Sequence, residues 1–443
     1  NLISIYINTD QKYKLKKLLE NYKNLSEEKE ILYGKAFSFY FENNYLDSIA
    51  VCKKIVEFQE FKFSIQDLLA SNFKKQKKFL DALKIYKQKL KDTKSHLVFY
   101  NIGLLFSELG RTRIAKYYFN KCREIKKDDH TNLFSLALCK LKLKDFENGF
   151  LLYENRFKKQ NPIELKFQHI KSPNFLSEIK DKKILIWDEQ GLGDTLQFSR
   201  FVIDLLKFTD QITFVVNAKL SQILSSLNKN VLVTSYENLV SENFDYQLPL
   251  CSLPKYLNID STDKINFFTL NKKNKYENNI FLDDKKFNIG VAWSGNKEYF
   301  LDTYRSIPFR YFENILKLKN INFFKLSKDV RDEDKSKYTS YPNLIDLGNR
   351  SLLEVSEYIK NLDLVISSDT SIIHLAGILN KKSILLLNYN SDWRWFNDDE
   401  TTKWYPSVKI IKQKRFDQWN DVFKILSDRV DLLKKKASKN SPF

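Results

Sequence analysis

The stretch KKILIWDEQGLGDTLQFSR, residues 182–200, decides the fold. Its first half, KKILIWDEQ (182–190), contains the apolar run ILIW of the kind that forms a buried strand, and apolar residues recur at helical spacing over 195–208. Between them two glycines, the second being Gly193, permit a tight turn that a ligand can approach. Asp194 falls at the helix start, where aspartate is a preferred cap. Strand, glycine turn and helix predict the first βα unit of a parallel sheet.

The same alternation continues toward the C-terminus. Further buried strands are predicted at 211–217, 231–236, 244–250, 288–296, 321–327, 343–348, 363–369 and 382–389, and a final amphipathic helix at 416–436. A polar stretch rich in Asn and Lys, residues 258–286, interrupts this series. The pattern therefore predicts two consecutive α/β lobes, joined by a linker.

Upstream of residue 165 the sequence repeats with a period of about 34 residues. Three series share this register: small residues at Ala36, Ala70, Gly103 and Ala137, small residues at Ser48, Ala82, Ala115 and Gly149, and bulkier ones at Cys52, Tyr86, Phe119 and Tyr153. Small residues let two helix backbones approach, and a larger one fills the gap beside them. The pattern resembles four tetratricopeptide repeats over 29–162 after a capping helix at 10–27, with an ordinary helical bundle as the alternative.

Composition narrows the class of protein. A chain of 443 residues exceeds what one core serves, so several domains are expected. Four cysteines without a CxxC pair indicate reduced thiols and a cytoplasmic protein, and no apolar run reaches the roughly 20 residues of a transmembrane segment. The net charge of +19 comes from scattered lysines without a stacking stripe of aromatics, so we expect no nucleic-acid partner. A basic surface still favours a ligand that carries phosphate.

Candidate ligand residues follow predicted strands, because ligands of open parallel sheets bind beyond the carboxyl ends of the strands. In SSDTSIIHLAGIL (367–379), Asp369 is predicted to accept hydrogen bonds from sugar hydroxyls. Thr370 and Ser371 open a helix whose free N–H groups suit a pyrophosphate. His374 lies one turn later, either as a ligand or as a buried structural imidazole.

A third loop, GVAWSGN (290–296) followed by YRSIP (304–308), supplies further candidates. Its candidate ligand-binding residues are Trp293, Ser294, Asn296 and Arg305, to which Lys325 and Lys328 in FFKLSK are added. A guanidinium can fork onto a diphosphate, although a lone Arg305 also fits a surface charge. Nothing in the sequence requires a metal or another cofactor, since the acidic triplet at 332–334 is interpreted as a solvated loop. Trp393 and Trp395 fit either stacking on a ligand or burial as core aromatics.

Taken together, these motifs resemble bacterial tetratricopeptide-repeat proteins fused to a glycosyltransferase domain of the heptosyltransferase-like type, family nine. The resemblance rests on LIWDEQGLGDTLQFSR, GVAWSGN, RSIP, NLDLVISSDTSIIHLAGIL, SDWRWF and WYP, in the family's order within about residues 145–425. Where the family commonly has IxSVDT and HLAGALGKP, this chain has ISSDT and HLAGILNKK, which loses a proline but no proposed ligand.

The resemblance implies an all-α repeat superhelix followed by an α/β GT-B fold, meaning two Rossmann-like lobes. The implied domains are repeats at 1–164, an acceptor-side lobe at 165–270, a donor-binding lobe at 271–436 whose last helix returns to the first lobe, and a tail at 437–443.

By similarity, Asp194 is the general base, Gly193 and Arg305 contact the donor, and Asp369 with Thr370 and His374 forms the donor-site pattern DTxxxH. The implied reaction is the inverting, metal-independent transfer of a sugar from a nucleotide-sugar to an acceptor hydroxyl.

Three functions stay open at this stage. The chain is a glycosyltransferase acting on a polypeptide that the repeats recruit, a transferase of lipopolysaccharide or polysaccharide assembly whose repeats form homo-oligomers, or a scaffold without catalysis. The joint presence of Asp194, Arg305 and Asp369 favours an enzyme, and the fused repeats favour a polypeptide acceptor.

Overall fold

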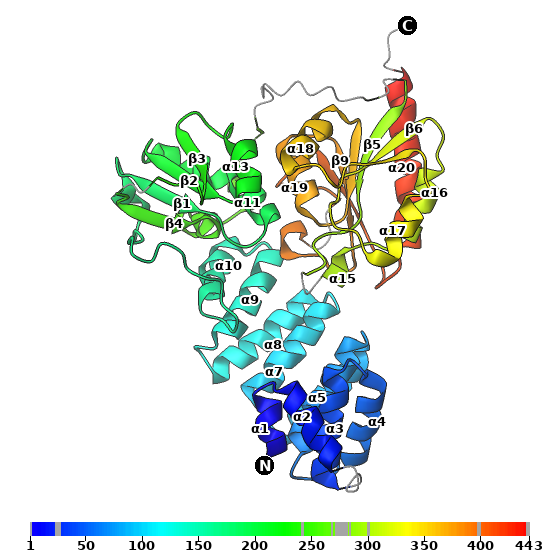
Figure 1. The fold of residues 1–443 in the computed structure, drawn as a ribbon. Coiled ribbons are helices and arrows are strands. Elements are labelled where there is room, and N and C mark those ends of the chain that lie inside the picture. Colours follow the sequence, from blue (N-terminus) through cyan, green and yellow to red (C-terminus); the bar gives the residue numbers. More distant parts are fainter. Residues whose placement is uncertain are drawn as a thin grey trace. The chain divides into compact units, whose positions relative to one another are not determined.

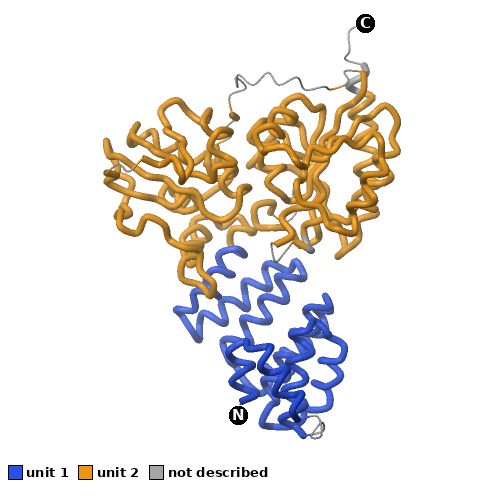
Figure 2. Tube along the Cα trace, in the orientation of Figure 1, with its two compact units in different colours: residues 1–139 blue, residues 140–443 orange. Residues whose placement is uncertain are grey.

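A computed structural model of the chain describes residues 2–22, 28–240, 243–266, 269–270, 282, 285–298, 302–396 and 400–439. The chain divides into two compact units, Asn1–Cys139 and Lys140–Phe443 (Figure 2). The predicted linker at 258–286 lies largely outside the described residues, and so do residues 23–27 of the predicted capping helix. Among the described residues, no helix combines the length and the apolar character needed to cross a bilayer.

The first unit consists of helical hairpins (Figure 1). Its helices are α1 Leu2–Asn8, α2 Lys12–Asn21, α3 Lys29–Phe41, α4 Tyr45–Ile55, α5 Lys62–Lys75, α6 Phe79–Asp92, α7 His96–Glu108 and α8 Thr112–Ile125, and α9 His130–Lys142 spans the division. The hairpins α3–α4, α5–α6 and α7–α8 are the first three predicted repeats. The fourth is α9 with α10 Phe146–Tyr153.

The residues of the repeat pattern pack as predicted. The hydroxyl of Ser48 donates a hydrogen bond to the carbonyl of Ala36 at 2.7 Å. This bond links α4 to α3 where both helices carry small residues. In the third hairpin a Cβ added at Gly103 would lie 2.6 Å from Cε1 of Phe119, so the aromatic ring occupies the space that glycine leaves. The small and bulky series thus mark helix contacts, which confirms the tetratricopeptide-type repeats.

The second unit contains two parallel sheets (Figure 1). The first lobe holds strands β1 Ile184–Trp187, β2 Ile212–Val216, β3 Val231–Ser235 and β4 Tyr246–Pro249, with helices α11 Leu192–Phe198, α12 Arg200–Asp204, α13 Ala218–Leu224 and α14 Leu253–Tyr256. The second lobe holds strands β5 Phe287–Ala292, β6 Ile321–Lys325, β7 Leu344–Asp346, β8 Leu364–Ser367, β9 Ser383–Leu387 and β10 Val408–Lys412. Its helices are α15 Asp302–Arg305, α16 Glu313–Leu316, α17 Asp332–Tyr338, α18 Leu352–Asn361, α19 Ser371–Ile378 and α20 Asn420–Lys439.

Strand order identifies where ligands should bind in each lobe. The first sheet runs β3-β2-β1-β4 and the second β10-β9-β8-β5-β6-β7, with every pair of neighbouring strands parallel. The second order is that of the Rossmann fold, and the first is the same order cut short after its fourth strand. The direction in which the strand order proceeds across the sheet reverses between β1 and β4 in one sheet and between β5 and β8 in the other. These two switch points confirm the predicted fold class, GT-B, and mark the ligand-binding ends.

Two expectations are corrected. The last helix, α20, packs through Val422, Phe423 and Leu426 on the core of the second lobe, instead of returning to the first, because its apolar stripe fits that sheet face. The acidic triplet at 332–334 is not a loop: it forms the first turn of α17. There Asp334 is buried, which raises the pKa of its carboxyl.

Candidate active site

The helices that follow β1 and β8 pack against each other, and we call this contact between α11 and α19 the lobe junction. A Cβ added at Gly193 would lie 2.9 Å from Cδ2 of His374 and 3.6 Å from Cα of Ser371. The glycine therefore permits close approach of the two lobes. Predicted residues of both lobes therefore meet here, Gly193 from the first and Ser371 with His374 from the second, since each helix starts just beyond a strand of its switch point.

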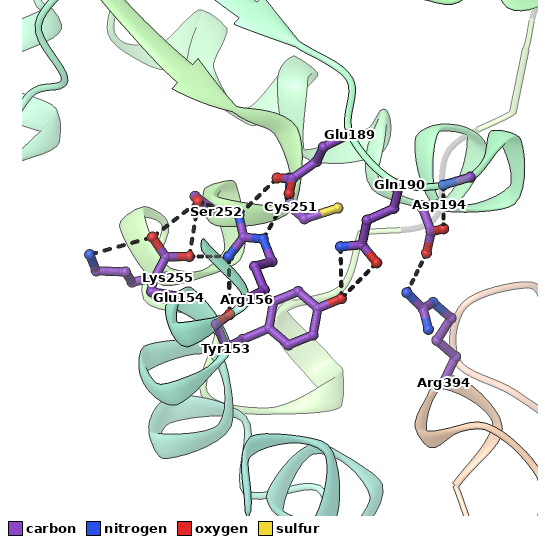
Figure 3. A network of polar contacts seen from close by, with 11 residues as sticks. Tyr153, Glu154, Arg156, Glu189, Gln190, Asp194, Cys251, Ser252, Lys255 and Arg394 are labelled. Atoms are coloured by element: carbon purple, nitrogen blue, oxygen red, sulfur yellow. Dashed lines mark hydrogen bonds and ion pairs between the residues drawn. The ribbon is translucent and has the colours of Figure 1, made fainter. Parts of the chain in front are cut away.

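The carboxylate of Asp194 forms a contact between the two lobes at the lobe junction. Oδ2 accepts a hydrogen bond from the backbone N–H of Gly191 at 2.9 Å, and Oδ1 forms an ion pair with Nη2 of Arg394 in the second lobe (Figure 3). The guanidinium also donates to Oδ1 of Asp392 at 2.8 Å. Burial alone would lower the pKa of Arg394, but the charges of Asp194 and Asp392 outweigh it and raise this pKa well above its usual value.

Asp369 and His374 lie together on the second-lobe side. Oδ1 of Asp369 is 3.9 Å from Nε2 of His374, whose Nδ1 is 2.9 Å from the hydroxyl of Tyr405. The imidazole also stacks on Trp395, with ring centroids 5.2 Å apart. Burial, reinforced by the charges of nearby arginines, lowers the pKa of His374 well below its usual value, so the ring stays neutral. Burial, with the charge of Asp392, raises the pKa of Asp369 to about 6.

Arg305 contributes a second cation. Its Nε lies 3.3 Å from Oδ1 of Asp302, and its guanidinium rests on the backbone of Gly295, where an added Cβ would lie 2.5 Å from Nη2. The charge of Arg305 contributes to lowering the pKa of both Asp369 and His374, after the larger effects of burial and of other charges. The contacts of Arg305 with Asp302 and Gly295 lie in the segment that follows β5.

The junction holds buried polar atoms for which the described residues supply no hydrogen-bond partner. They are the side-chain amide of Gln197, Nη2 of Arg200, Nε of Arg394 and Oγ of Ser368. Buried polar groups are almost always paired, so such atoms indicate where water or a ligand completes the site. Most of them are donors, and two belong to guanidinium groups. Within the described residues no three side chains of His, Cys, Asp or Glu are grouped to hold a metal ion.

Several predicted residues lie apart from this group. Trp293 is buried in the second-lobe core against Phe309, with ring centroids 5.1 Å apart. Lys325 is buried and pairs with Oδ1 of Asp346 at 2.8 Å. Ser294 donates to the carbonyl of Asp329.

Two more predicted residues, Asn296 and Lys328, are exposed at the surface. Oδ1 of Asn296 accepts a hydrogen bond from the backbone N–H of Glu298 at 3.0 Å. Thr370 lies nearer the junction at the start of α19, with its hydroxyl 3.2 Å from Oγ of Ser367.

Sequence reasoning missed four residues of the junction: Arg200, Arg394, Asp392 and Tyr405. All four lie in motifs that carried the family resemblance or next to them, namely QFSR, SDWRWF and WYP. The sequence signal for Arg394 is its place between Trp393 and Trp395, of which only the two tryptophans were predicted as possible ligand contacts. Both tryptophans are buried, and Trp393 packs on Phe150 and Tyr153.

A hollow of about 430 Å³ lies elsewhere, where β2 and β3 of the first lobe begin. Lys183, Asp210 and Lys229 line it, together with apolar strand residues. None of the predicted site residues is among its lining residues, so it does not compete with the junction as the candidate site.

Known proteins were compared with this chain by family and by structure. No protein-family model matches the sequence, and no curated protein matches it either. The chain is similar to several solved structures. ADP-heptose LPS heptosyltransferase II of E. coli shares 12% identity, with 58% of this chain and 99% of that chain covered and a TM-score of 0.44.

A family 9 glycosyl transferase of Veillonella parvula shares 13% identity, covering 60% of this chain and 99% of that chain with a TM-score of 0.42. MamA from Desulfovibrio magneticus shares 12% identity, covering 35% of this chain and 88% of that chain with a TM-score of 0.31. A tetratricopeptide repeat protein from Parabacteroides merdae shares 17% identity, covering 29% of this chain and 52% of that chain with a TM-score of 0.28.

Proposed function

We propose that the chain is an inverting, metal-independent glycosyltransferase that moves a sugar from a nucleotide-sugar donor to an acceptor hydroxyl. One observation carries this proposal: Asp194 of the first lobe meets Arg394 of the second at the junction of two Rossmann-type lobes. A base and a cation are thereby presented from opposite sides to one place, as glycosyl transfer from a diphosphate requires.

The second lobe is the proposed donor side. Arg305 and Arg394 supply two guanidinium groups, which bind diphosphate through paired charge-assisted hydrogen bonds. The N-terminus of α19 adds backbone N–H groups, and Thr370 makes no side-chain capping bond to them. Asp369, beside these groups, is proposed to accept hydrogen bonds from sugar hydroxyls. Because Gly193 already touches His374, donor binding requires the lobes to part and close again.

The proposed reaction balances around Asp194. The acceptor oxygen attacks the anomeric carbon from the face opposite the leaving group, forming a new C–O bond as the bond to the diphosphate oxygen breaks. Asp194 takes the proton of the hydroxyl, since that hydroxyl is far too weak an acid to ionise alone near neutral pH. The nucleoside diphosphate leaves with the bonding pair, and the arginines stabilise its charge. Configuration at the anomeric carbon is inverted.

The acceptor is proposed to be a polypeptide that the repeats recruit. Helical hairpins of the first unit support this, because stacked repeats present extended surfaces for binding. Deleting residues 1–139 distinguishes a polypeptide acceptor from a glycan acceptor. Loss of transfer to polypeptide with donor hydrolysis retained supports the proposal, whereas undiminished transfer to a lipopolysaccharide or polysaccharide precursor favours the alternative.

A matched pair of variants tests the role of Asp194. Asp194→Asn and Asp392→Asn each remove one of the two carboxylates that contact Arg394. A panel of nucleoside diphosphates in a thermal-shift assay first identifies which nucleobase the protein binds, because a ligand of the folded state raises the stability of that state. Release of that diphosphate from the sugar donor then measures turnover.

Asp194→Asn should lower kcat by about 10²- to 10⁴-fold and leave diphosphate affinity nearly unchanged. Asp392→Asn should lose a similar amount of stability and keep most of its turnover. Unaltered turnover in the first variant removes Asp194 from the mechanism. An equal loss in both assigns the effect to the disturbed Arg394 instead of to a missing base.

A further inference from the structure

The last helical hairpin ends in a buried arginine. A 3-10 turn, Glu154–Phe157, follows α10 and carries Arg156, whose side chain is fully buried. Its guanidinium forks onto Glu189, with Nε to Oε2 and Nη2 to Oε1 both at 2.8 Å (Figure 3). The Glu189 side chain is only 1% exposed. Two opposite charges are thus removed from water and held in fixed mutual geometry.

Every N–H of this guanidinium has an acceptor. Besides the two bonds to Glu189, Nη1 donates to Oε1 of Glu154 at 2.5 Å and to the carbonyl of Tyr153 at 3.3 Å. Nη2 donates to Oγ of Ser252 at 2.7 Å. An arginine has five such donors, and five bonds are present. The ring of Phe157 covers one face of the group at 4.0 Å.

This cluster occupies the switch point of the first lobe. Glu189 lies in the loop after β1, and Ser252 with Cys251 lies just beyond β4, the neighbouring strand on the other side of the reversal. The backbone N–H of Cys251 also donates to Oε1 of Glu189, at 3.1 Å. Arg156 therefore fastens together the two loops between which this lobe would receive its ligand.

The same hairpin holds the next residue of the loop. Gln190 has a φ of 64°, a left-handed conformation that residues other than glycine seldom adopt. Its side-chain amide contacts the hydroxyl of Tyr153 twice, at 2.9 and 3.2 Å. Gly191 follows, and its N–H binds the carboxylate of Asp194. A continuous line of contacts thus leads from the end of the repeats to the proposed base.

We infer that Arg156 and Glu189 are positioning residues for transfer, and that α10 with its 3-10 turn is part of the active site instead of the recruiting array. This inference rests on the proposed function. Stability alone does not account for the pair, because apolar residues of similar volume often stabilise such a position as well as a buried ion pair. What the fork adds is a fixed geometry for the loop that carries Asp194.

The test uses the full chain with the double substitution Arg156→Met and Glu189→Leu, which removes both charges and leaves neither unpaired. We expect a folded protein with unchanged affinity for the nucleoside diphosphate and a kcat lowered by about tenfold or more, since an ångström of misplacement costs up to about 10²-fold. The matched control is Lys360→Met with Glu357→Leu, a partly buried pair 2.7 Å apart in α18. It should keep wild-type kcat.

Tyr153→Phe provides a second variant that retains the buried shape and removes only the hydroxyl bound to Gln190. It should fold and lose turnover several-fold without a change in donor KM. Wild-type kcat in this folded variant, or in the double variant, overturns the inference. Failure of the proposed function is recognised separately, because then Asp194→Asn itself retains turnover.

Discussion

Replacing Gly295 with alanine should weaken binding of a nucleoside diphosphate and leave the fold intact. A Cβ at this position would lie 2.5 Å from Nη2, 2.8 Å from Cζ and 2.9 Å from Nε of Arg305. Ordinary contacts of a Cβ begin near 3.4 Å, so the guanidinium must move by about 0.9 Å. The atoms displaced are the end of a flexible side chain that is 26% exposed, and Gly295 has no left-handed backbone. The cost to folding is therefore small.

The cost to binding follows from the bond that is misplaced. A charge-assisted hydrogen bond contributes about 1.5–3 kcal/mol, and each 1.4 kcal/mol is a factor of ten in affinity. If Arg305 holds the diphosphate, the Kd should rise about 10- to 100-fold in Gly295→Ala, although the charge of the protein is unchanged. Arg305→Ala sets the upper limit of the effect.

Isothermal titration calorimetry with the nucleoside diphosphate selected by thermal shift measures both variants. Arg310→Ala is the charge control, because Arg310 is exposed and donates to the hydroxyl of its neighbour Tyr311, at 3.5 Å. Wild-type affinity in Gly295→Ala and in Arg305→Ala together removes Arg305 from the donor site. A large drop in Tm for Gly295→Ala refutes the reasoning that the guanidinium can give way.

Two further predictions concern pH and domain boundaries. Nucleotide-sugar affinity should fall as pH drops through about 6, where Asp369 takes up its proton, and this dependence should vanish in Asp369→Asn. Because the pKa of Asp369 is raised on folding, its ionised form costs stability above about pH 6, and the cost is relieved at lower pH; Asp369→Asn should therefore raise Tm near neutral pH. Deleting residues 1–139 should leave a folded unit by circular dichroism and thermal denaturation. Deleting 1–164 should cost about 3–5 kcal/mol more, because Glu189 then stays buried without Arg156.

Most of the fold could be predicted because its signals are local. The repeat series reports contacts within one hairpin, and buried strands of four to six residues are continuous apolar runs. The exception is β10, Val408–Lys412, which pairs with β9 at one end of the sheet and is bridged on its other side by Thr401 at Lys409. Its two lysines break the apolar run, as is typical of edge strands. The first turn of α17 was missed because three acidic residues were judged by charge and not by their favourable place at a helix start.

The alternation of side chains along a strand explains why two predicted site residues lie apart from the lobe junction. Ile289, Val291 and Trp293 alternate and all join the second-lobe core, so the period of two already directs Trp293 away from the ligand loops. Lys325 pairs in register with Asp346 of the neighbouring strand, which accounts for its burial beside a carboxylate. The burial of Trp293 follows from the face of its strand, and the pairing of Lys325 follows from the register of its strand.

Contacts that complete the junction could not be predicted in this way. Asp194 and Arg394 are 200 residues apart and belong to different sheets, so their ion pair depends on how α11 and α19 pack. The 33-residue separation of Arg156 and Glu189 likewise crosses from a helical repeat into a sheet. Local patterns identify which strand ends carry polar residues, but the partner of a charge is decided by tertiary packing.

The charged groups at the two switch points differ between the lobes, which bears on where the phosphates of the proposed donor would bind. In the first lobe Glu189 is neutralised by Arg156, which leaves Asp194 as the carboxylate directed at the junction. In the second lobe Arg305, which pairs with Asp302, and the N-terminus of α19 bring positive charge beside the carboxylate of Asp369. Under the proposed function, these groups bind the phosphates of the donor. Because Arg394 contacts the proposed base and belongs to the proposed donor lobe, the proposed reaction requires the two lobes to close on each other before base and leaving group are aligned.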